Sequence, residues 1–163
     1  MPLGHEYVEL VAVVDREEAA ASEFGRPVME AVASGQRLVG WAVATDDLAG
    51  IARRLNLEVT TGSRTRPDGS TLRWQLAGVG HALAARGLPF FIQWNAPPRL
   101  HPGAAVADHR VTPRGIGWIE IAAEEQSLRA WLGDHDLPVR IAEGPPSLSA
   151  VAISMAAGEL VLR

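Results

Sequence analysis

The sequence predicts an α+β protein of two tandem β-α-β-β-β modules, whose strands form curved mixed sheets with the helices on the outer face. The order strand, helix, three strands occurs twice, at roughly residues 38–94 and 116–163, and a proline-rich stretch at 95–115 separates the two copies. Repetition of a supersecondary unit is a strong signal of fold. Each unit has too small a sheet to bury alone, so we expect the two to pack together or across a dimer.

Composition excludes several classes of protein. Of the 163 residues, 47% are hydrophobic and 21% charged, as in a folded globular domain. The net charge is −4, all basic side chains are arginine, and no basic run is present, which argues against nucleic-acid binding. There is no cysteine, and neither a signal peptide nor a membrane-spanning apolar segment is evident. We therefore predict a cytoplasmic protein.

Residues 1–37 are predicted to hold one strand and one helix. The valine-rich stretch 7–14 favours a strand, interrupted by Glu9. Acidic residues from Asp15 onward, followed by alanines, indicate the start of a helix, because carboxylates stabilise the positive end of the helix dipole. Ser34 and Gly35 end that segment.

The first module, residues 38–94, begins with a short apolar strand at 40–44. Residues 45–47 provide an N-cap, and apolar residues at helical spacing follow as far as Asn56. A strand at 58–63, a turn at 66–69 and a strand at 71–77 come next, since proline and glycine suit the bend. After a glycine-rich connection, residues 89–94 form the last strand.

The second module, residues 116–163, repeats this order after the linker loop 95–115. A strand at 117–122 leads into a helix at 124–132. The remaining elements are a strand at 139–142, a turn at 144–146, and strands at 148–155 and 159–162.

Four segments of the first module carry a resemblance to a known family: residues 40–48, the arginine-rich turn 62–69, Leu72-Arg73-Trp74 and residues 88–94. They resemble the glyoxalase-like domain family of the vicinal oxygen chelate superfamily. The resemblance implies paired β-α-β-β-β modules. Relatives usually have an additional first module, and residues 5–10 resemble its last strand. We therefore expect another subunit to complete the fold, or the N-terminal strand to pair differently.

The resemblance also implies a divalent metal held by His, Gln or Glu from the first and last strands of the modules. The corresponding positions here are Gly40 or Trp41, Gln93, Gly117 or Trp118, and Glu159 or Val161. Only Glu9, on the apparent remnant strand, matches a carboxylate ligand well. One carboxylate and one glutamine make a poor transition-metal site. We predict no metal and no cofactor, with a divalent metal as the alternative.

Alternation along the strands defines a candidate ligand-binding set. If the helices cover Leu72, Trp74 and Leu76, then Arg73 and Gln75 point into the concave side of the sheet. The full set is Glu9, Arg73, Gln75, Gln93 and Glu120, together with His101 from the linker loop. Two readings stay open: a small-molecule pocket in which Arg73 grips an oxyanion, or an internal Arg–Glu network. The tryptophans are expected in the core.

The leading hypothesis is a metal-free protein that binds a small organic ligand in the concave sheet, with no catalytic residue assigned. One alternative is a metal-dependent lyase, isomerase or dioxygenase. The other is a catalytically silent subunit that associates through an exposed sheet edge. A homodimer is expected both for the metal-free binding protein and for the catalytically silent subunit.

Overall fold

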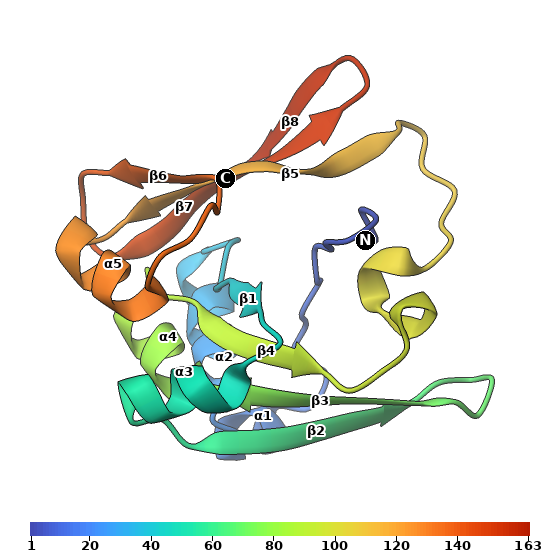
Figure 1. The fold of residues 1–163 in the computed structure, drawn as a ribbon, viewed down its shortest axis with the longest axis horizontal. Helices are drawn as coiled ribbons and strands as arrows, with labels where there is room; N and C mark the ends of the chain where they lie inside the picture. The colour runs from blue at the N-terminus through green and yellow to red at the C-terminus, as the bar shows by residue number, and fades with distance from the viewer.

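The computed structural model describes all residues 1–163 and shows an α+β fold with two open four-stranded mixed sheets (Figure 1). The first sheet has the strand order β1-β4-β3-β2, and the second has the order β6-β5-β7-β8. The first sheet contains β1 (Ala42–Ala44), β2 (Val59–Thr65), β3 (Thr71–Ala77) and β4 (Phe90–Trp94). The second sheet contains β5 (Pro113–Ala122), β6 (Val139–Ala142), β7 (Ser147–Met155) and β8 (Gly158–Leu162). The predicted fold class is confirmed.

The strand predicted at 7–14 is wrong. The only pairing in this region is an isolated antiparallel bridge between Pro2 and Tyr7. Leu10 and Val14 are 90% and 98% exposed. Valine favours strands only where a neighbouring strand takes up its backbone hydrogen bonds, and this segment is part of neither sheet. Two helices follow it, α1 (Arg16–Ala21), whose N-cap is Asp15, and α2 (Gly25–Ser34).

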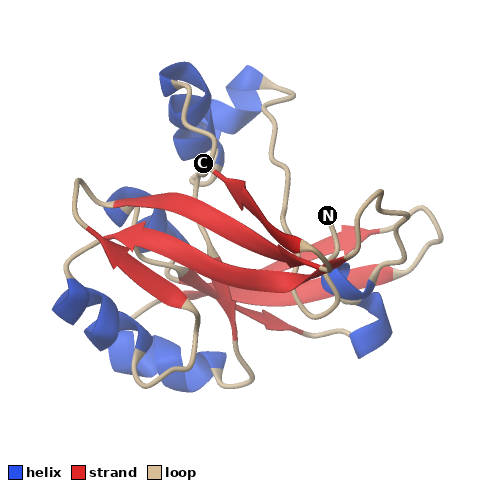
Figure 2. Ribbon diagram, turned by 90° about the horizontal axis from the view of Figure 1, so that it is seen from above, coloured by secondary structure: helices blue, strands red, loops and turns tan.

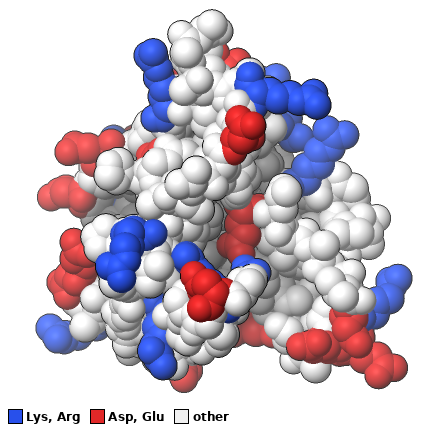
Figure 3. Space-filling view, turned by 90° about the vertical axis from the view of Figure 1, so that its right-hand side faces the viewer, with Lys and Arg blue, Asp and Glu red and all other residues white.

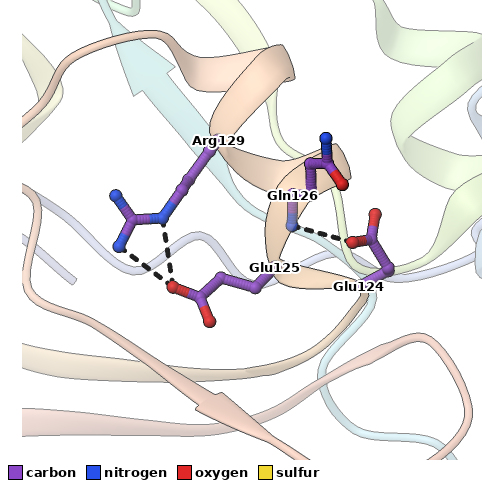
Figure 4. A network of polar contacts seen from close by, with 4 residues as sticks. All are labelled: Glu124, Glu125, Gln126 and Arg129. Carbon is purple, nitrogen blue, oxygen red and sulfur yellow. Dashed lines mark hydrogen bonds and ion pairs between the residues drawn. The ribbon is translucent and has the colours of Figure 1, made fainter.

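Local capping explains where the two crossover helices begin. In α3 (Leu48–Leu55) the Asp47 carboxylate accepts a hydrogen bond from Gly50 N at 2.9 Å. In α5 (Glu125–Leu132) Glu124 accepts from the backbone N–H of Gln126 and of Ser127. Figure 4 shows this cap beside the exposed Glu125–Arg129 pair, whose charged atoms lie 2.9 Å apart. These caps satisfy N–H groups that have no acceptor within the helix.

Three short helices lie in segments that were predicted as connections. They are α4 (Val79–Ala85) between β3 and β4, and the 3₁₀ turns η1 (Pro98–Leu100) and η2 (Pro102–Ala104) in the loop before β5. Glycines at 78, 80 and 87 obscure the helical tendency of the alanine-rich stretch that forms α4. None of the helices has the length and apolar character needed to cross a bilayer.

One hydrophobic cluster joins the two units. It contains Leu48 and Ala52 from α3, Leu128 and Leu132 from α5, and Ala77 and Phe91 from the first sheet. Polar contacts reinforce it, since Trp131 Nε1 donates to the Pro89 carbonyl at 2.8 Å. A second cluster, centred on Ile121 and Val151, packs against Trp41. The two sheets therefore share a core instead of forming independent domains.

The helices lie on two sides of the strands. In Figure 1, α3 lies in front of the first sheet and α5 lies above α3 at the left, whereas α1 and α2 lie behind the sheet. Figure 2, seen from above, shows the same two groups of helices on opposite sides of the strands. Figure 3 shows a side of the molecule on which arginine and acidic side chains are interspersed without a continuous basic area.

Candidate functional site

The structure reverses the predicted faces of the first sheet. Ala77 packs with Leu48 and Ala52 of α3, so the odd-numbered residues of β3 face that helix. Arg73 and Gln75 follow the same alternation and lie on the α3 side. Gln75 pairs directly with Gln93, whose Oε1 accepts a hydrogen bond from Leu48 N at 3.1 Å. The condition on which that placement depended, a helix over Leu72, Trp74 and Leu76, does not hold for α3, which lies on the side of Arg73 and Gln75.

The predicted polar set is not assembled into one group. Glu9 is exposed in the irregular N-terminal segment. Glu120 lies on the second sheet, where its Oε1 accepts from Ser149 Oγ at 2.8 Å. Neither Arg73 nor Glu120 takes part in the ion pairs of the structure, which are Arg86–Glu30 and Arg129–Glu125. The internal Arg–Glu network is therefore not formed either.

The face of the first sheet opposite α3 carries an aromatic group instead. Trp74 and Trp94 are cross-strand partners, and their ring centroids lie 5.5 Å apart. His101 from the linker loop lies 5.5 Å from Trp94, and Tyr7 lies 5.7 Å from His101 and 6.3 Å from Trp94. We call these four residues the aromatic donor cluster. His101 is its only member among the predicted site residues.

A glycine in the neighbouring strand makes room for this cluster. Gly62 of β2 pairs with Trp74, and a Cβ atom on Gly62 would overlap with the indole nitrogen. The absence of a side chain therefore lets the Trp74 ring lie across β2. Glycine in a strand often marks such a close approach.

The cluster contains hydrogen-bond donors without protein acceptors. Trp94 Nε1 is buried and has no partner. His101 Nδ1 accepts from Gly103 N at 3.1 Å, which leaves the proton of the neutral ring on Nε2. The phenol of Tyr7, which keeps its proton at neutral pH, supplies a third donor. A buried donor that lacks an acceptor costs about 1–3 kcal/mol.

Burial keeps the titratable members of the cluster uncharged. Burial raises the pKa of Tyr7 to about 12, and the Glu9 carboxylate adds to the rise. Burial also lowers the pKa of His101, and His5 nearby lowers it further. At neutral pH the phenol is therefore protonated and the imidazole is favoured in its neutral form.

The N-terminal segment is tied to the loops that surround the cluster. Gly4 N donates to the Gly103 carbonyl at 3.0 Å, and His109 Nε2 lies 3.0 Å from the Pro2 carbonyl oxygen. At the start of β5, Ile116 N donates to Glu6 Oε2 at 2.7 Å. These contacts place Tyr7 beside Trp94 although the segment has no strand structure.

A model of a family described as "Glyoxalase-like domain" matches residues 1–135. The chain belongs to the glyoxalase-like domain family. The match is consistent with the vicinal oxygen chelate superfamily, and it includes every residue of the aromatic donor cluster, whereas β6, β7 and β8 lie beyond it. No curated protein and no solved structure matches the chain.

The residues of this glyoxalase-like protein do not fit the metal site that the resemblance implies. No three His, Cys, Asp or Glu side chains lie close enough together to hold a metal ion. Gln93 is occupied with the N-terminus of α3, and Glu159 Oε2 accepts from Trp118 Nε1 at 3.0 Å. On the second sheet, Glu159 lies on the same face as Trp118, and a side chain on Gly117 would point toward it as well.

An open surface cleft of about 470 Å³ lies elsewhere, at the end of α4. Its lining residues are mostly small: Gln36, Ala84, Ala85, Arg86, Pro145, Pro146, Ser147 and Leu148. The volume is within the range of small-ligand sites. The cleft has no aromatic side chain, and its one charged group, Arg86, lies 3.5 Å from the Glu30 carboxylate.

Proposed function

We propose that this glyoxalase-like protein binds a small organic ligand at the aromatic donor cluster, and that its own residues do so without a metal. The buried, unpartnered Nε1 of Trp94 is the observation that carries this proposal. Buried polar groups nearly always have a partner, so one without an acceptor calls for an explanation. A ligand oxygen near Trp94 would supply the missing acceptor.

The cluster also defines the chemistry of the ligand. Trp74 and Trp94 offer apolar ring surface, whereas Tyr7, Trp94 and His101 offer donors and no cation. The Glu9 carboxylate acts on Tyr7, and a second negative charge there is unfavourable. The ligand favoured by these groups is an uncharged, flat molecule with a carbonyl or similar acceptor oxygen, in preference to a carboxylate.

Entry of the ligand requires the N-terminal segment to move, because Tyr7 covers the cluster from that segment. The segment has irregular backbone and a single β-bridge. Elements with few backbone bonds open at a lower free-energy cost than core strands. When Tyr7 shifts, the ligand binds between the aromatic rings, and the Tyr7 hydroxyl donates a hydrogen bond to the ligand's acceptor oxygen.

The test is a screen of neutral aromatic ketones and amides against the matching carboxylates, read by thermal shift and then by calorimetry and tryptophan fluorescence. Tyr7→Phe removes one hydroxyl and should weaken binding about two- to tenfold, as expected for a neutral hydrogen bond. Trp94→Phe should weaken it by roughly tenfold or more. Trp118→Phe, on the second sheet, is the matched control and should leave affinity unchanged.

Two results would contradict the proposal. One is a screen in which no neutral carbonyl compound binds. The other is a ligand whose affinity is unchanged by Tyr7→Phe and Trp94→Phe but is lost when the cleft beside α4 is filled by Ala85→Trp. That second result would move the site to the cleft.

A metal-dependent lyase, isomerase or dioxygenase stays a prediction from the resemblance, and the cytoplasmic location stays a prediction from the composition. Such an activity would need ligands beyond those that this chain brings together. Elemental analysis of protein purified without chelator tests it, because a stoichiometric divalent metal would favour this function over metal-free binding.

A further inference from the structure

The two sheets have four edge strands, and only one of them lacks protection. The edges are β1 and β2 in the first sheet and β6 and β8 in the second. β1 has three residues, and the four-residue β6 follows a proline and ends shortly before two more. β2 is rich in threonine, serine and arginine. Short length, polar residues and proline are the usual means of preventing edge-to-edge pairing.

β8 has none of these features beyond one glutamate. It presents Leu160, Val161 and Leu162 in sequence, and the first two are 46% and 37% exposed. Figure 1 shows the β7–β8 hairpin at the top of the molecule, projecting from the rest of the fold. An exposed apolar edge strand is a template for another strand.

The hairpin register shows which backbone groups of β8 point outward. Met155 pairs with Gly158 across a two-residue loop, so these two residues form a hydrogen-bonded pair. Pairs alternate along an antiparallel ladder, and Leu160 and Leu162 therefore bond back to β7. The N–H and C=O groups of Glu159 and Val161 face the open edge, and Arg163 continues this phase.

We propose that β8 pairs with β8 of a second copy of this chain, antiparallel about a two-fold axis at Val161. In this register Val161 lies opposite Val161 of the other copy, and Glu159 lies opposite Arg163 of the other copy, twice by symmetry. The three positions with outward backbone groups are therefore the three that pair. The second sheet of one copy and the second sheet of the other copy then form one continuous eight-stranded sheet across the dimer.

The side chains of β8 are complementary in the same register. Leu160 faces Leu162 of the other copy at positions where side chains come closest, which gives two apolar pairs. Glu159 meets an arginine of opposite charge on the other face. Trp118 Nε1 holds Glu159 Oε2 at 3.0 Å and so positions this carboxylate on the second sheet. Shifting the register by one residue would lose both sets of pairs.

The first experiment measures the mass of the full chain by sedimentation across a concentration series. The wild type should associate reversibly into a dimer. Val161→Pro removes an N–H that points away from β7, which an edge strand tolerates, and should weaken the dimer at least roughly tenfold with an unchanged circular dichroism spectrum. Val161→Thr is the matched control, because it keeps the N–H, the β-branched shape and the dimer.

A charge exchange keeps the test valid if the proline variant fails to fold. Arg163→Glu places two carboxylates opposite each other at both ends of the interface and should weaken association about tenfold. Adding Glu159→Arg to the same chain restores opposite charges and should recover most of the affinity. A monomeric wild type, or a dimer insensitive to both Val161→Pro and Arg163→Glu, would overturn the proposal. Neither result affects ligand binding at the aromatic donor cluster.

Discussion

The two units share the order strand, helix, three strands, apart from the additional helix α4 in the first, but they differ in how their strands pair. In the first unit, the starting strand β1 lies at the edge and pairs in parallel with the last strand, β4. In the second unit, the starting strand β5 lies inside the sheet between β6 and β7, and the last strand, β8, is at the edge. Equal element order therefore does not mean equal topology.

Strand length and burial explain this difference. β1 has three residues, none of which is buried, whereas β5 has ten, with Trp118, Ile119 and Ile121 buried on its two faces. A long buried strand has many backbone N–H and C=O groups, and these find hydrogen-bond partners when strands lie on both sides of it. A short strand can be left at an edge at little cost. The consequence is that the last strand is paired on both sides in the first unit and open on one side in the second.

The largest effect is expected where the two units share one core. Leu128 lies on α5 of the second unit but packs in the cluster of the first sheet. Leu128→Ala should lower the free energy of unfolding by about 2–5 kcal/mol. Because the core is shared, circular dichroism and tryptophan fluorescence should report one coincident urea transition.

The exposed Gln126 on the same helix is the control, and Gln126→Ala should change stability by no more than about 0.5 kcal/mol. Two separate transitions, one per unit, would show that the units fold independently and that the shared cluster contributes little.

A smaller effect on stability is expected from substitutions of glycine beside the aromatic face of the first sheet and away from it. Gly62→Ala brings a Cβ atom onto the Trp74 indole and should cost about 1–3 kcal/mol. Gly40→Ala is the matched change, since its nearest neighbour is a Leu83 methyl group at 3.8 Å and its stability should be nearly unchanged. Equal stability of the two variants in thermal unfolding would mean that Trp74 does not lie across β2.

The two faces of the first sheet can be compared through two indoles. Trp131 Nε1 has an acceptor in the Pro89 carbonyl, whereas Trp94 Nε1 has none. Both Trp→Phe changes remove similar ring volume, but only Trp131→Phe breaks a hydrogen bond. We expect Trp131→Phe to be the more destabilising by about 1–2 kcal/mol in urea denaturation. The reverse order would show that Trp94 Nε1 has a partner in solution.

The smallest effect at neutral pH concerns Tyr7, the only tyrosine in the chain. Absorbance near the phenolate band should show a titration midpoint of about 12 in the folded protein and near 10 in urea. A raised pKa means that the folded state holds this proton more tightly. Tyr7 therefore contributes stability below pH 10, and that contribution is lost as the pH rises from 10 to about 12.

Glu9→Gln removes the secondary cause of this rise and should lower the folded midpoint, while burial keeps it above the value in urea. A folded midpoint equal to that in urea would place Tyr7 in solvent and remove it from the aromatic donor cluster.

The sequence alone determined which segments form most of the helices and strands. Asp47 and the acidic residues at 124–125 mark helix starts through bonds within a few residues, and the 66–69 turn needs only its own proline and glycine. The alternation of β3 likewise separates Arg73 and Gln75 from Leu72, Trp74 and Leu76. The family resemblance rests on the same local segments, and the family match confirms it.

Only the tertiary structure decided which of the two sets of alternating β3 residues faces a helix, and which strands become neighbours. Alternation defines two faces but not the one that a helix covers, and here the small Ala77 fits beneath α3 while the tryptophans face the other way. The aromatic donor cluster joins residues 7 and 101 to β3 and β4, and no local pattern links positions so far apart. A pair of tryptophans on the same face of neighbouring strands was its only sequence signal. Valines at 7–14 failed to form a strand for the same reason, because a strand depends on a partner that its own residues do not specify.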